Sequence, residues 1–228
     1  MQLFITDDFK TSKEKIIITE DRIVNQLRKV LRAKPWCRFF LQPKTFSNPQ
    51  KRYLCQLNQL NNFVESEILS IEEKQINLPQ KWVITWILNK FDKMEVIVQK
   101  LTELAVPIIG FVPTERSQFK NIPEKKLQRF EKIQLEATEQ SFGRFLPQIK
   151  IFNKIEDIPG AKAVLNFNWK ATKEANWNFD FLLIWPEWGF TENDLKKISP
   201  LETIKLGETV LRAETASIIG GYELIKNL

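Results

Sequence analysis

The stretch WVITWILNKFDKMEVIVQKLTELAVPIIGFVP, from Trp82 to Pro113, decides the fold. Its first seven residues and its last six are apolar runs of strand length, rich in β-branched and aromatic side chains. Between them, KMEVIVQKLTELA (Lys93 to Ala105) has the period of an amphipathic helix. A strand, a helix and a strand in this order predict a parallel βαβ unit. We expect the helix to turn four side chains inward: Val96, Ile97, Leu101 and Leu104.

The same alternation continues toward the C-terminal end of the sequence. A further helix is expected to open at Pro123, because proline is favoured in a first turn. AKAVLNF and FDFLLIW predict two strands, TENDLKKI a short helix capped by Thr191, and ETASIIGGYELIKN a last helix. The pattern predicts an α/β domain with a mainly parallel sheet. Ligands of such sheets bind beyond the carboxyl ends of the strands, here at the loops near Trp185 and Leu206.

The first 75 residues have a different pattern. They contain short apolar, β-branched or alternating runs that predict strands of a small barrel. Those runs are LFIT, KIIIT, CRFFLQ, RYLCQLNQL and VESEILSIEE. One helix, DRIVNQLRKVLR (Asp21 to Arg32), lies among them, with Ile23, Val24, Leu27, Val30 and Leu31 at helical spacing. Pro79 interrupts the pattern within INLPQK, so we expect a domain over 1–75 and a second over 76–228.

Charge adds a weaker signal about partners. The chain has 34 basic and 28 acidic residues, and the excess is concentrated in QLRKVLRAK and PEKKLQRFEK. This surplus suits a nucleic-acid partner, whose phosphates attract lysine and arginine, and it suits an ordinary lysine-rich surface almost as well. Arg28, Lys29 and Arg32 could therefore bind the phosphates of a nucleic acid or form a solvent-exposed helix face.

Other classes of protein are disfavoured. Cys37 and Cys55 are too few and too isolated for a disulfide framework or a metal site, so we interpret them as structural thiols in a reducing compartment. The N-terminal residues lack the features of a signal peptide. Each apolar run falls far short of the roughly 20 residues that cross a bilayer. We expect a cytoplasmic protein with no membrane partner and no metal.

Near the C-terminus, IWPEWGF (184–190) and LGETVLRAETA (206–216) predict a binding site. A strand, a turn at Gly207 and an abrupt helix start near Glu214 would present backbone groups to a ligand, and glycine permits a close approach. Two other stretches, QKLTELAVPIIGFVPTERS (99–117) and EATEQSFGRFLP (136–147), accompany them in order. Together the four resemble the RsmE-like family of small-subunit rRNA uridine-N3 methyltransferases, in the SPOUT superfamily. The strongest matches are Gln99, Lys100, Glu103, Thr114, Glu115, Arg116, Glu139, Gln140, Pro186, Glu187, Gly189, Leu206, Gly207, Leu211, Arg212, Glu214 and Thr215.

The resemblance implies a PUA-like RNA-binding β-barrel followed by a SPOUT α/β domain threaded into a trefoil knot. It further implies methylation of N3 of a specific uridine in 16S rRNA, with free rRNA or the small ribosomal subunit as partner. S-adenosylmethionine is the implied cofactor, and the implied assembly is a homodimer. The residues implied to bind the cofactor are Leu165, Asn166, Pro186, Glu187, Gly189, Leu206, Gly207, Val210 and Leu211.

Methyl transfer to N3 requires that the base leaves its helix, that the N3 proton is removed and that negative charge on the neighbouring oxygens is stabilised. The chain has no histidine, so the side chain that most often acts as a general base in enzymes is excluded. Arg212 and Arg116 are the expected electrostatic groups. Glu214 is a candidate proton acceptor or, alternatively, a carboxylate at a helix start. The candidates for RNA contact are Arg28, Lys29, Arg32 and Arg144.

Three tryptophans depart from the family pattern. Trp36, Trp185 and Trp188 stand where the family has glycines, in a chain with only seven glycines. One hypothesis is that UGA codons meaning glycine were translated as tryptophan. The alternative is divergence into a catalytically silent RNA-binding or ribosome-assembly protein whose donor loop is blocked by Trp185 and Trp188. A third interpretation is a methyltransferase that acts on tRNA or on another rRNA site.

Overall fold

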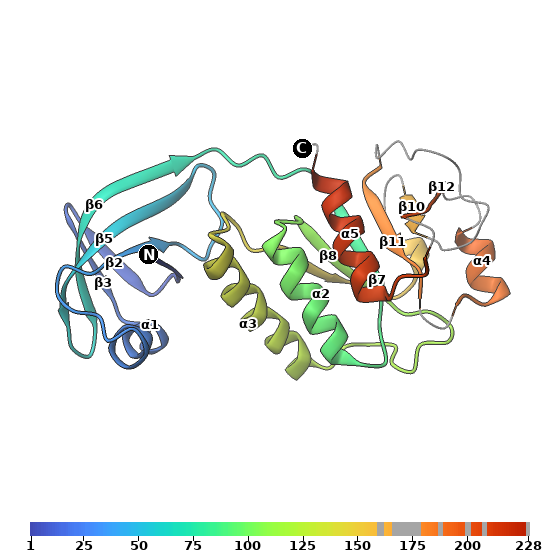
Figure 1. The fold of residues 1–228 in the computed structure, drawn as a ribbon, viewed down its shortest axis with the longest axis horizontal. Helices are drawn as coiled ribbons and strands as arrows, with labels where there is room; N and C mark the ends of the chain where they lie inside the picture. The colour runs from blue at the N-terminus through green and yellow to red at the C-terminus, as the bar shows by residue number, and fades with distance from the viewer. Residues whose placement is uncertain (159–161, 166–178, 187–188, 199–201, 207–208, 227–228) are drawn as a thin grey trace. The chain divides into compact units, whose positions relative to one another are not determined.

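The computed structural model describes residues 1–158, 162–165, 179–186, 189–198, 202–206 and 209–226 (Figure 1). The chain divides into two compact units. The first contains Met1–Asn77 and Thr138–Leu146, and the second contains Leu78–Ala137 and Pro147–Leu228. Helix α3 (Glu124–Ser141) therefore begins in the second unit and ends in the first.

The first unit is built on a six-stranded sheet of order β1-β4-β5-β6-β3-β2. Neighbouring strands are antiparallel except β1 and β4, which are parallel. The long strands β5 and β6 carry two register shifts, which mark bulges. The strand bounds are β1 Gln2–Ile5, β2 Phe9–Ser12, β3 Lys15–Ile18, β4 Arg38–Gln42, β5 Gln50–Leu60 and β6 Val64–Lys74.

The helical segment of the first unit is only partly as expected. Helix α1 (Asp21–Asn25) is followed by the π-helical turn η1 (Gln26–Val30), and Ile23, Val24 and Leu27 are buried in the core. Val30 and Leu31 were expected at helical spacing with these residues, but their side chains are 73% and 43% exposed. The wider π turn shifts the phase of the helix. It therefore carries the last two apolar residues out of the buried stripe.

Within the first unit, a buried carboxylate fixes the C-terminal end of α3. Glu139, which is 4% exposed, accepts a hydrogen bond from the backbone nitrogen of Ile5 at 2.8 Å. Nη1 of Arg22 donates to both oxygens of the same carboxylate at 3.0 Å, and its Nη2 donates to the carbonyl of Ile5. Charge-assisted hydrogen bonds of this kind are about twice as strong as neutral ones. The helix end is therefore held by β1 and α1 together.

A second arginine binds the residues that follow α3. Arg52 donates to the carbonyl oxygens of Phe142 at 3.1 Å and Gly143 at 2.8 Å, and to the side chain of Gln42. Burial, together with the nearby charge of Arg144, lowers the pKa of Arg52 to about 10. The guanidinium remains charged at neutral pH, so it satisfies carbonyl groups that the helix end leaves open.

The second unit has a parallel six-stranded sheet of order β12-β10-β11-β7-β8-β9. Every pair of neighbouring strands is parallel, which confirms the expected α/β class. The short strand β9 had no counterpart in the sequence prediction. The strand bounds are β7 Trp82–Trp86, β8 Ile108–Val112, β9 Gln148–Ile151, β10 Lys162–Leu165, β11 Phe181–Ile184 and β12 Glu202–Ile204.

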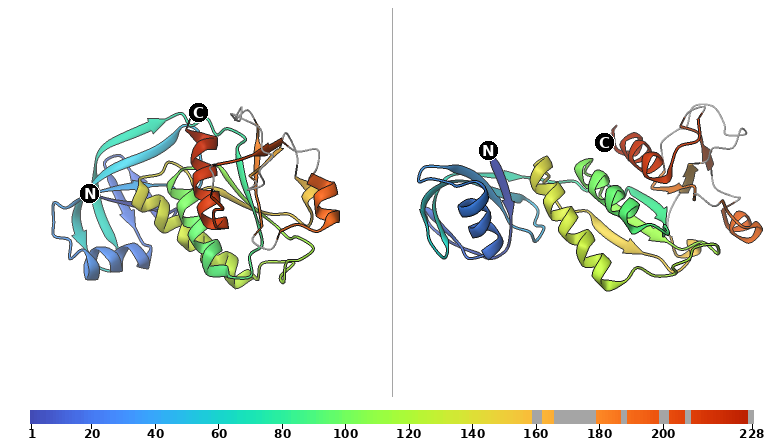
Figure 2. Two further views of the ribbon diagram at one scale, coloured as in Figure 1. Left: turned by 45° about the vertical axis from the view of Figure 1, so that its right-hand side comes forward. Right: turned by 60° about the horizontal axis from the view of Figure 1, so that its bottom comes forward.

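Alternate residues of these strands face two different hydrophobic clusters. One cluster packs against α2 (Phe91–Glu103), α3 and α5 (Ala213–Ile225), which lie along one face of the sheet (Figure 2). The other contains Trp82, Trp86 and Phe181 and packs against residues after β9, where the 3-10 turn η2 (Ile155–Asp157) lies. In α2, Ile97 and Leu101 are buried as expected, whereas Val96 is 41% exposed.

Glycines bring α5 close to the sheet. A Cβ added to Gly220 would lie 2.5 Å from Cδ1 of Leu165 and 2.7 Å from Cδ2 of Leu182, closer than side chains tolerate. At Gly221 the same atom would lie 2.6 Å from Cδ2 of Leu101, on α2. The Gly-Gly pair therefore lets α5 pack closely against β10, β11 and α2.

The backbone at Trp36 has the conformation that glycine favours. Its φ is +75°, and its side chain is 74% exposed. Its backbone nitrogen donates to the carbonyl of Leu57 at 2.8 Å, so the turn is tied to β5. Ala105, which follows α2, also has a positive φ, +58°. These values favour the recoded-glycine hypothesis at position 36; Trp185 has no positive φ, and Trp188 lies outside the described residues.

We predict that Trp36→Gly raises the free energy of unfolding by about 1 kcal/mol. A non-glycine residue in the left-handed region destabilises the folded state by about 1–2 kcal/mol. Glycine removes this strain, but it also makes the unfolded chain more flexible, which offsets part of the gain in stability. Urea denaturation measures the difference. The neighbouring exposed Lys34 has no positive φ, so Lys34→Gly should lower stability. Equal losses in both variants would show that the turn does not favour glycine.

Candidate functional site

The carboxyl ends of the parallel strands in the second unit carry most of the predicted site. Because these strands are parallel, the loops after β8, β10, β11 and β12 all leave from the same edge of the sheet. Among the predicted cofactor residues, Asn166, Glu187 and Gly207 lie outside the described residues. The structure places Leu165 at the end of β10, Pro186 and Gly189 after β11, and Leu206, Val210 and Leu211 after β12.

The loop after β11 is a closed turn. The backbone nitrogen of Gly189 donates to the carbonyl of Pro186 at 3.1 Å, and Gly189 has φ +67°. A residue with a Cβ would be strained there. The backbone nitrogen of Trp185 donates to the carbonyl of Leu165 at 3.1 Å. Two of the predicted cofactor loops are therefore joined at their bases.

Arg116 reaches this turn from the loop after β8. Its Nη1 lies 3.9 Å from the position that a Cβ on Gly189 would occupy. The neighbouring Glu115 accepts hydrogen bonds from Oγ1 of Thr191, at 2.8 Å, and from Nδ2 of Asn193. These bonds, first that of Asn193 and then that of Thr191, lower the pKa of Glu115. Glu115 thus ties the two loops together as an ionised carboxylate.

Helix α4 (Glu192–Ile198) begins as predicted at Thr191. Oγ1 of Thr191 accepts from the backbone nitrogen of Asp194 at 3.0 Å, and Oδ2 of Asp194 accepts from the backbone nitrogen of Thr191 at 3.2 Å. This is a reciprocal capping box, which satisfies two donors at the helix start. The cap keeps Asp194 at the carboxyl edge of the sheet.

The start of α5 lies beside the start of α2. Arg212 is the N-cap residue of α5, and its side chain is exposed. Glu214 is in the first turn; its Oε2 is buried, makes no hydrogen bond among the described residues and lies 3.8 Å from Nζ of Lys93. The partial positive charge of both helix starts favours anionic groups here.

Trp185 is packed within the site. Its ring lies 4.4 Å from that of Phe190 in an edge-to-face arrangement, and Phe190 lies 4.9 Å from Trp86 in the same way. These rings join the hydrophobic cluster beneath the loops. The Trp185 indole therefore has a place within this cluster.

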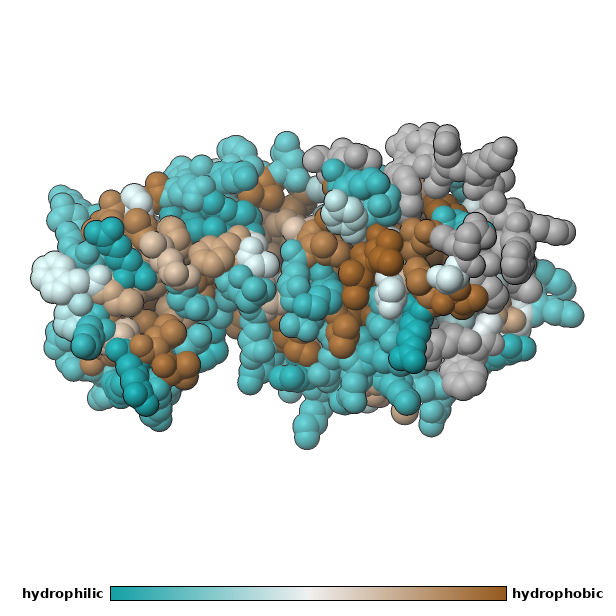
Figure 3. Space-filling view, in the orientation of Figure 1, coloured by the Kyte–Doolittle hydropathy of each residue, from teal (hydrophilic) through white to brown (hydrophobic). Residues whose placement is uncertain are grey.

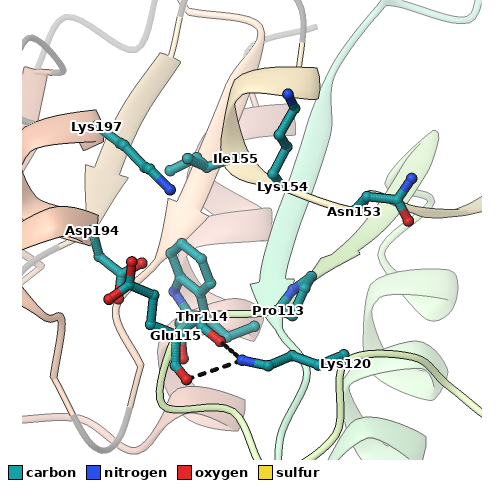
Figure 4. A pocket seen from close by; sticks show the side chains of 10 residues that line it. Pro113, Thr114, Glu115, Lys120, Asn153, Lys154, Ile155, Asp194 and Lys197 are labelled. Atoms are coloured by element: carbon teal, nitrogen blue, oxygen red, sulfur yellow. Dashed lines mark hydrogen bonds between the residues drawn. The ribbon is translucent and has the colours of Figure 1, made fainter.

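A pocket of about 160 Å³ opens beside these loops (Figure 4). It is lined by the end of β7, the residues that follow β8 and β9, and one side of α4. Lys120 reaches across and donates to the carbonyl oxygens of Thr114 at 2.7 Å and Glu115 at 2.9 Å. The sequence analysis did not anticipate Asn153, Lys154 or Lys197, because no motif marks them.

The four predicted RNA contacts lie in the first unit. Arg28, Lys29 and Arg32 are exposed at or just after η1, and no carboxylate of the described residues pairs with them. Arg144 forms an ion pair with Glu72 at 2.5 Å, and its side chain is only 18% exposed. Nη2 of Arg28 donates to the carbonyl of Asn61, so its charge, like those of Lys29 and Arg32, is left without a carboxylate among the described residues, whereas Arg144 already neutralises one.

Two kinds of site receive no support within the described ranges. The described ranges hold no group of three histidine, cysteine, aspartate or glutamate side chains that could bind a metal ion. Among the helices of those ranges, none is long and apolar enough to cross a membrane. The cysteines are free: Cys37 is exposed, and burial raises the pKa of Cys55 to about 12.

A family profile described as an RNA methyltransferase domain matches residues 76–220, more than half of the chain. The chain belongs to this RNA methyltransferase family. Curated relatives are named Ribosomal RNA small subunit methyltransferase E, which confirms the resemblance to the RsmE-like family. The protein of that name from Rickettsia conorii is 27% identical over 218 residues, covering 90% of this chain and 86% of its own. That from Mesomycoplasma hyopneumoniae is 29% identical over 189 residues, covering 77% and 82%.

A solved structure shares the fold of this RNA methyltransferase. It is the Ribosomal RNA small subunit methyltransferase E from Neisseria gonorrhoeae, bound to S-adenosyl methionine. It superimposes with a TM-score of 0.77 at 23% identity and covers 100% of this chain and 98% of its own. At this identity the likeness establishes the fold.

Proposed function

We propose that this protein transfers a methyl group from S-adenosylmethionine to N3 of a specific uridine in 16S rRNA. The observation that carries the proposal is the cluster at the carboxyl edge of the parallel sheet. There the loop after β8 brings Arg116 to the glycine turn after β11. Membership of the RNA methyltransferase family and the names of the relatives give the reaction class and the substrate class.

The described residues fit the proposed cofactor. A closed turn with a positive-φ glycine offers backbone groups to a ligand, and the base of that turn is tied to Leu165. The buried Oε2 of Glu214 adds a polar group without a hydrogen bond in the described residues. We assign cofactor binding to Leu165, Pro186, Gly189, Leu206, Val210 and Leu211, with Asn166, Glu187 and Gly207 assigned from the resemblance. When bound, S-adenosylmethionine supplies an electrophilic methyl group.

Three side chains of the chain itself are proposed to act on the base. Arg212, exposed at the start of α5, and Arg116 stabilise the negative charge that grows on the uracil oxygens as N3 loses its proton. Glu214 is our candidate to accept that proton, since its carboxylate lies in the first turn of the same helix as Arg212. A histidine base is excluded, because the chain has no histidine.

The architecture of the family completes the proposal. We propose that the first unit is a PUA-like RNA-binding barrel and that the second contains the SPOUT trefoil knot. The mainly antiparallel sheet of the first unit and the parallel sheet of the second are consistent with these assignments. The natural setting would be the cytoplasm, where ribosomal subunits are assembled.

The direct test supplies labelled S-adenosylmethionine and, in separate reactions, small or large ribosomal subunits isolated from cells without this activity. We expect label in 16S rRNA and none in large-subunit rRNA. Calorimetric titration of S-adenosylmethionine into the chain and a Trp185→Gly, Trp188→Gly variant tests the donor loop. Binding by both, or only by the glycine variant, supports a methyltransferase. Binding by neither favours the silent RNA-binding protein.

We predict that Arg28→Glu, Lys29→Glu, Arg32→Glu weakens binding to rRNA by 100-fold or more at low salt. Each lost phosphate contact also reduces the slope of log affinity against log salt by about 0.7–0.9. Fluorescence anisotropy over a salt series measures both quantities. The charge-matched control Lys10→Glu, Lys13→Glu, Lys74→Glu replaces exposed lysines elsewhere in the first unit. Equal losses in both variants would mean that only net charge matters.

An exposed apolar face supports the proposed homodimer. Ile219 and Tyr222 on α5 are 39% and 52% exposed, and Val96 on the adjacent α2 is 41% exposed. Figure 3 shows hydrophobic side chains gathered over these helices. Apolar patches of this kind commonly mark interfaces, and we propose that a second copy of the chain covers this one.

We predict that Ile219→Glu, Tyr222→Glu converts a dimer into a monomer, because two buried charges per chain would have to be desolvated at the interface. Light scattering coupled to size exclusion measures the mass. The control Lys125→Glu, Lys132→Glu places the same charges on α3 and should remain dimeric. A monomeric parent protein would contradict the assignment of this face.

A further inference from the structure

The loop after β8 meets the loop after β11 through two contacts that adjoin in the chain. Glu115 accepts hydrogen bonds from Oγ1 of Thr191, at 2.8 Å, and from Nδ2 of Asn193. The next residue, Arg116, has its Nη1 3.9 Å from the position that a Cβ on Gly189 would occupy. Gly189 precedes Thr191 by two residues. Glu115 is therefore attached to the second loop beside the place where Arg116 reaches the glycine turn.

The segment that carries Glu115 and Arg116 is fixed within itself. The backbone nitrogen of Thr114 donates to Oγ of Ser117 at 2.9 Å, and the backbone nitrogen of Ser117 donates to the carbonyl of Thr114 at 3.2 Å. Lys120 donates to the carbonyl oxygens of Thr114 and Glu115 (Figure 4). Because these bonds hold the segment in one shape, a shift of Glu115 would carry Arg116 with it.

The partners of Glu115 on the second loop belong to a helix start that is also fixed. Thr191 and Asp194 cap α4 reciprocally, and Asp194 is 6% exposed. Further along α4, Lys197 pairs with Glu156 of η2 at 3.4 Å. The bonds of Glu115 therefore join two segments that each keep their own shape. Their relative position depends on the contacts between them.

The reaction makes this position important for Arg116. A group that stabilises charge in a transition state acts only when it lies where the charge develops. A displacement of about 1 Å can lower a rate by about 100-fold. Glu115 is exposed, so its bonds to α4 are not part of the core and their loss should leave the fold intact.

We propose that Glu115 is a positioning residue that acts through Arg116. Its bonds to Thr191 and Asn193 set the distance between the Arg116 guanidinium and the glycine turn at Gly189. This inference rests on the proposed function, in which Arg116 stabilises negative charge on the uracil. Glu115 itself contacts neither the methyl donor nor the base.

The first test is a double-mutant cycle on the rate of methyl transfer, measured in single turnovers with small ribosomal subunits and saturating S-adenosylmethionine. Arg116→Ala should slow the reaction by about 100- to 1,000-fold. Glu115→Ala should slow it by about 10- to 100-fold. If Glu115 acts through Arg116, the double variant is no slower than Arg116→Ala alone. Losses that multiply in the double variant would overturn the proposal.

A second cycle tests the partner of Glu115 on α4. Asn193→Ala removes one of the two bonds, so it should slow the reaction less than Glu115→Ala does. Adding it to Glu115→Ala should cause no further loss. The control Glu156→Ala removes the ion pair between η2 and α4 and should keep the parent rate. A loss in Glu156→Ala as large as that in Glu115→Ala would assign the effect to the whole helix and overturn the proposal.

Calorimetric titration of S-adenosylmethionine into the same variants separates positioning from damage to the donor site. Glu115→Ala and Asn193→Ala should bind the donor nearly as well as the parent, which also shows that they are folded. A loss of donor affinity as large as the loss of rate would overturn the action through Arg116. Methyl transfer by the parent with independent losses would overturn this inference alone. A parent protein that binds the donor and transfers no methyl group would contradict the proposed function and this inference with it.

Discussion

Glu139→Ala is expected to lower the free energy of unfolding by about 2–3 kcal/mol, because it removes the shared acceptor of the buried Ile5 backbone nitrogen and the half-buried Arg22 guanidinium. In the native chain Glu139 accepts three hydrogen bonds, one from the backbone of Ile5 and two from Arg22. Removing the carboxylate leaves the buried backbone nitrogen of Ile5 unsatisfied and takes one of two carboxylate partners from Arg22, which also pairs with Glu20 at 2.7 Å. Equilibrium denaturation in urea, followed by tryptophan fluorescence, measures the loss.

A control on the same helix separates this effect from helix propensity. Glu136 is exposed and pairs with Lys132 at 4.0 Å. Ion pairs of that kind contribute about 0.3–0.5 kcal/mol, so Glu136→Ala should change stability very little. Similar losses in the two variants would contradict the role given to the Glu139 carboxylate. A large loss in Glu139→Ala alone would show that the C-terminal end of α3 is fixed by this contact.

Arg212→Ala is expected to reduce the rate of methyl transfer by about 100- to 1,000-fold, the usual effect of removing one group that stabilises charge in a transition state. The affinity for S-adenosylmethionine should change little, because the effect falls on the reacting base. Arg212→Lys should recover part of the rate, since it restores charge without the planar fork of arginine. Single-turnover kinetics with saturating donor measures the rate.

A matched control for Arg212 is Arg129→Ala. Arg129 is exposed on α3 and pairs with Glu95 at 3.4 Å, away from the loops of the site. It should retain the parent rate. If Arg212→Ala kept full activity while still binding rRNA, the role proposed for this residue would be wrong. Loss of donor affinity in the same proportion as the rate would move Arg212 from the base to the donor.

The order of strands and helices in the second unit could be predicted because both faces of a parallel sheet are buried. WVITWIL and IIGFVP are continuous apolar runs, as central strands of such a sheet must be. β9 was missed because QIKI is only four residues long and half polar. β9 forms a strand because it pairs with β8, and such pairing cannot be read from the local sequence.

Tertiary contacts explain the other differences from the sequence predictions. The π turn after Asn25 exposes Val30 and Leu31, although their spacing is helical. Glu139 stood out only as part of a motif, and its buried contacts come from residues more than 100 positions away. The pocket draws its residues from four separate stretches of the chain, so no spacing rule could collect them.

The sequence motifs identified several residues of the candidate site, but not the contacts between them. Arg116 and Gly189 came from separate motifs, and the structure brings them together because β8 and β11 both flank β7. The position of Arg212 at the start of α5 was likewise expected from the abrupt helix start. The hydrogen bonds by which Glu115, Thr191 and Asn193 join the two loops were not expected. Contacts between residues so far apart in the chain leave no local pattern in the sequence.

The most direct test of the central claim is the chemical identity of the methylated nucleoside. Small ribosomal subunits that lack the modification are incubated with the protein and S-adenosylmethionine, and the 16S rRNA is digested and analysed by liquid chromatography and mass spectrometry. We predict 3-methyluridine at one position, formed in proportion to enzyme turnover. A product methylated on ribose or on another base, or no product from a chain that binds the donor, would contradict the account.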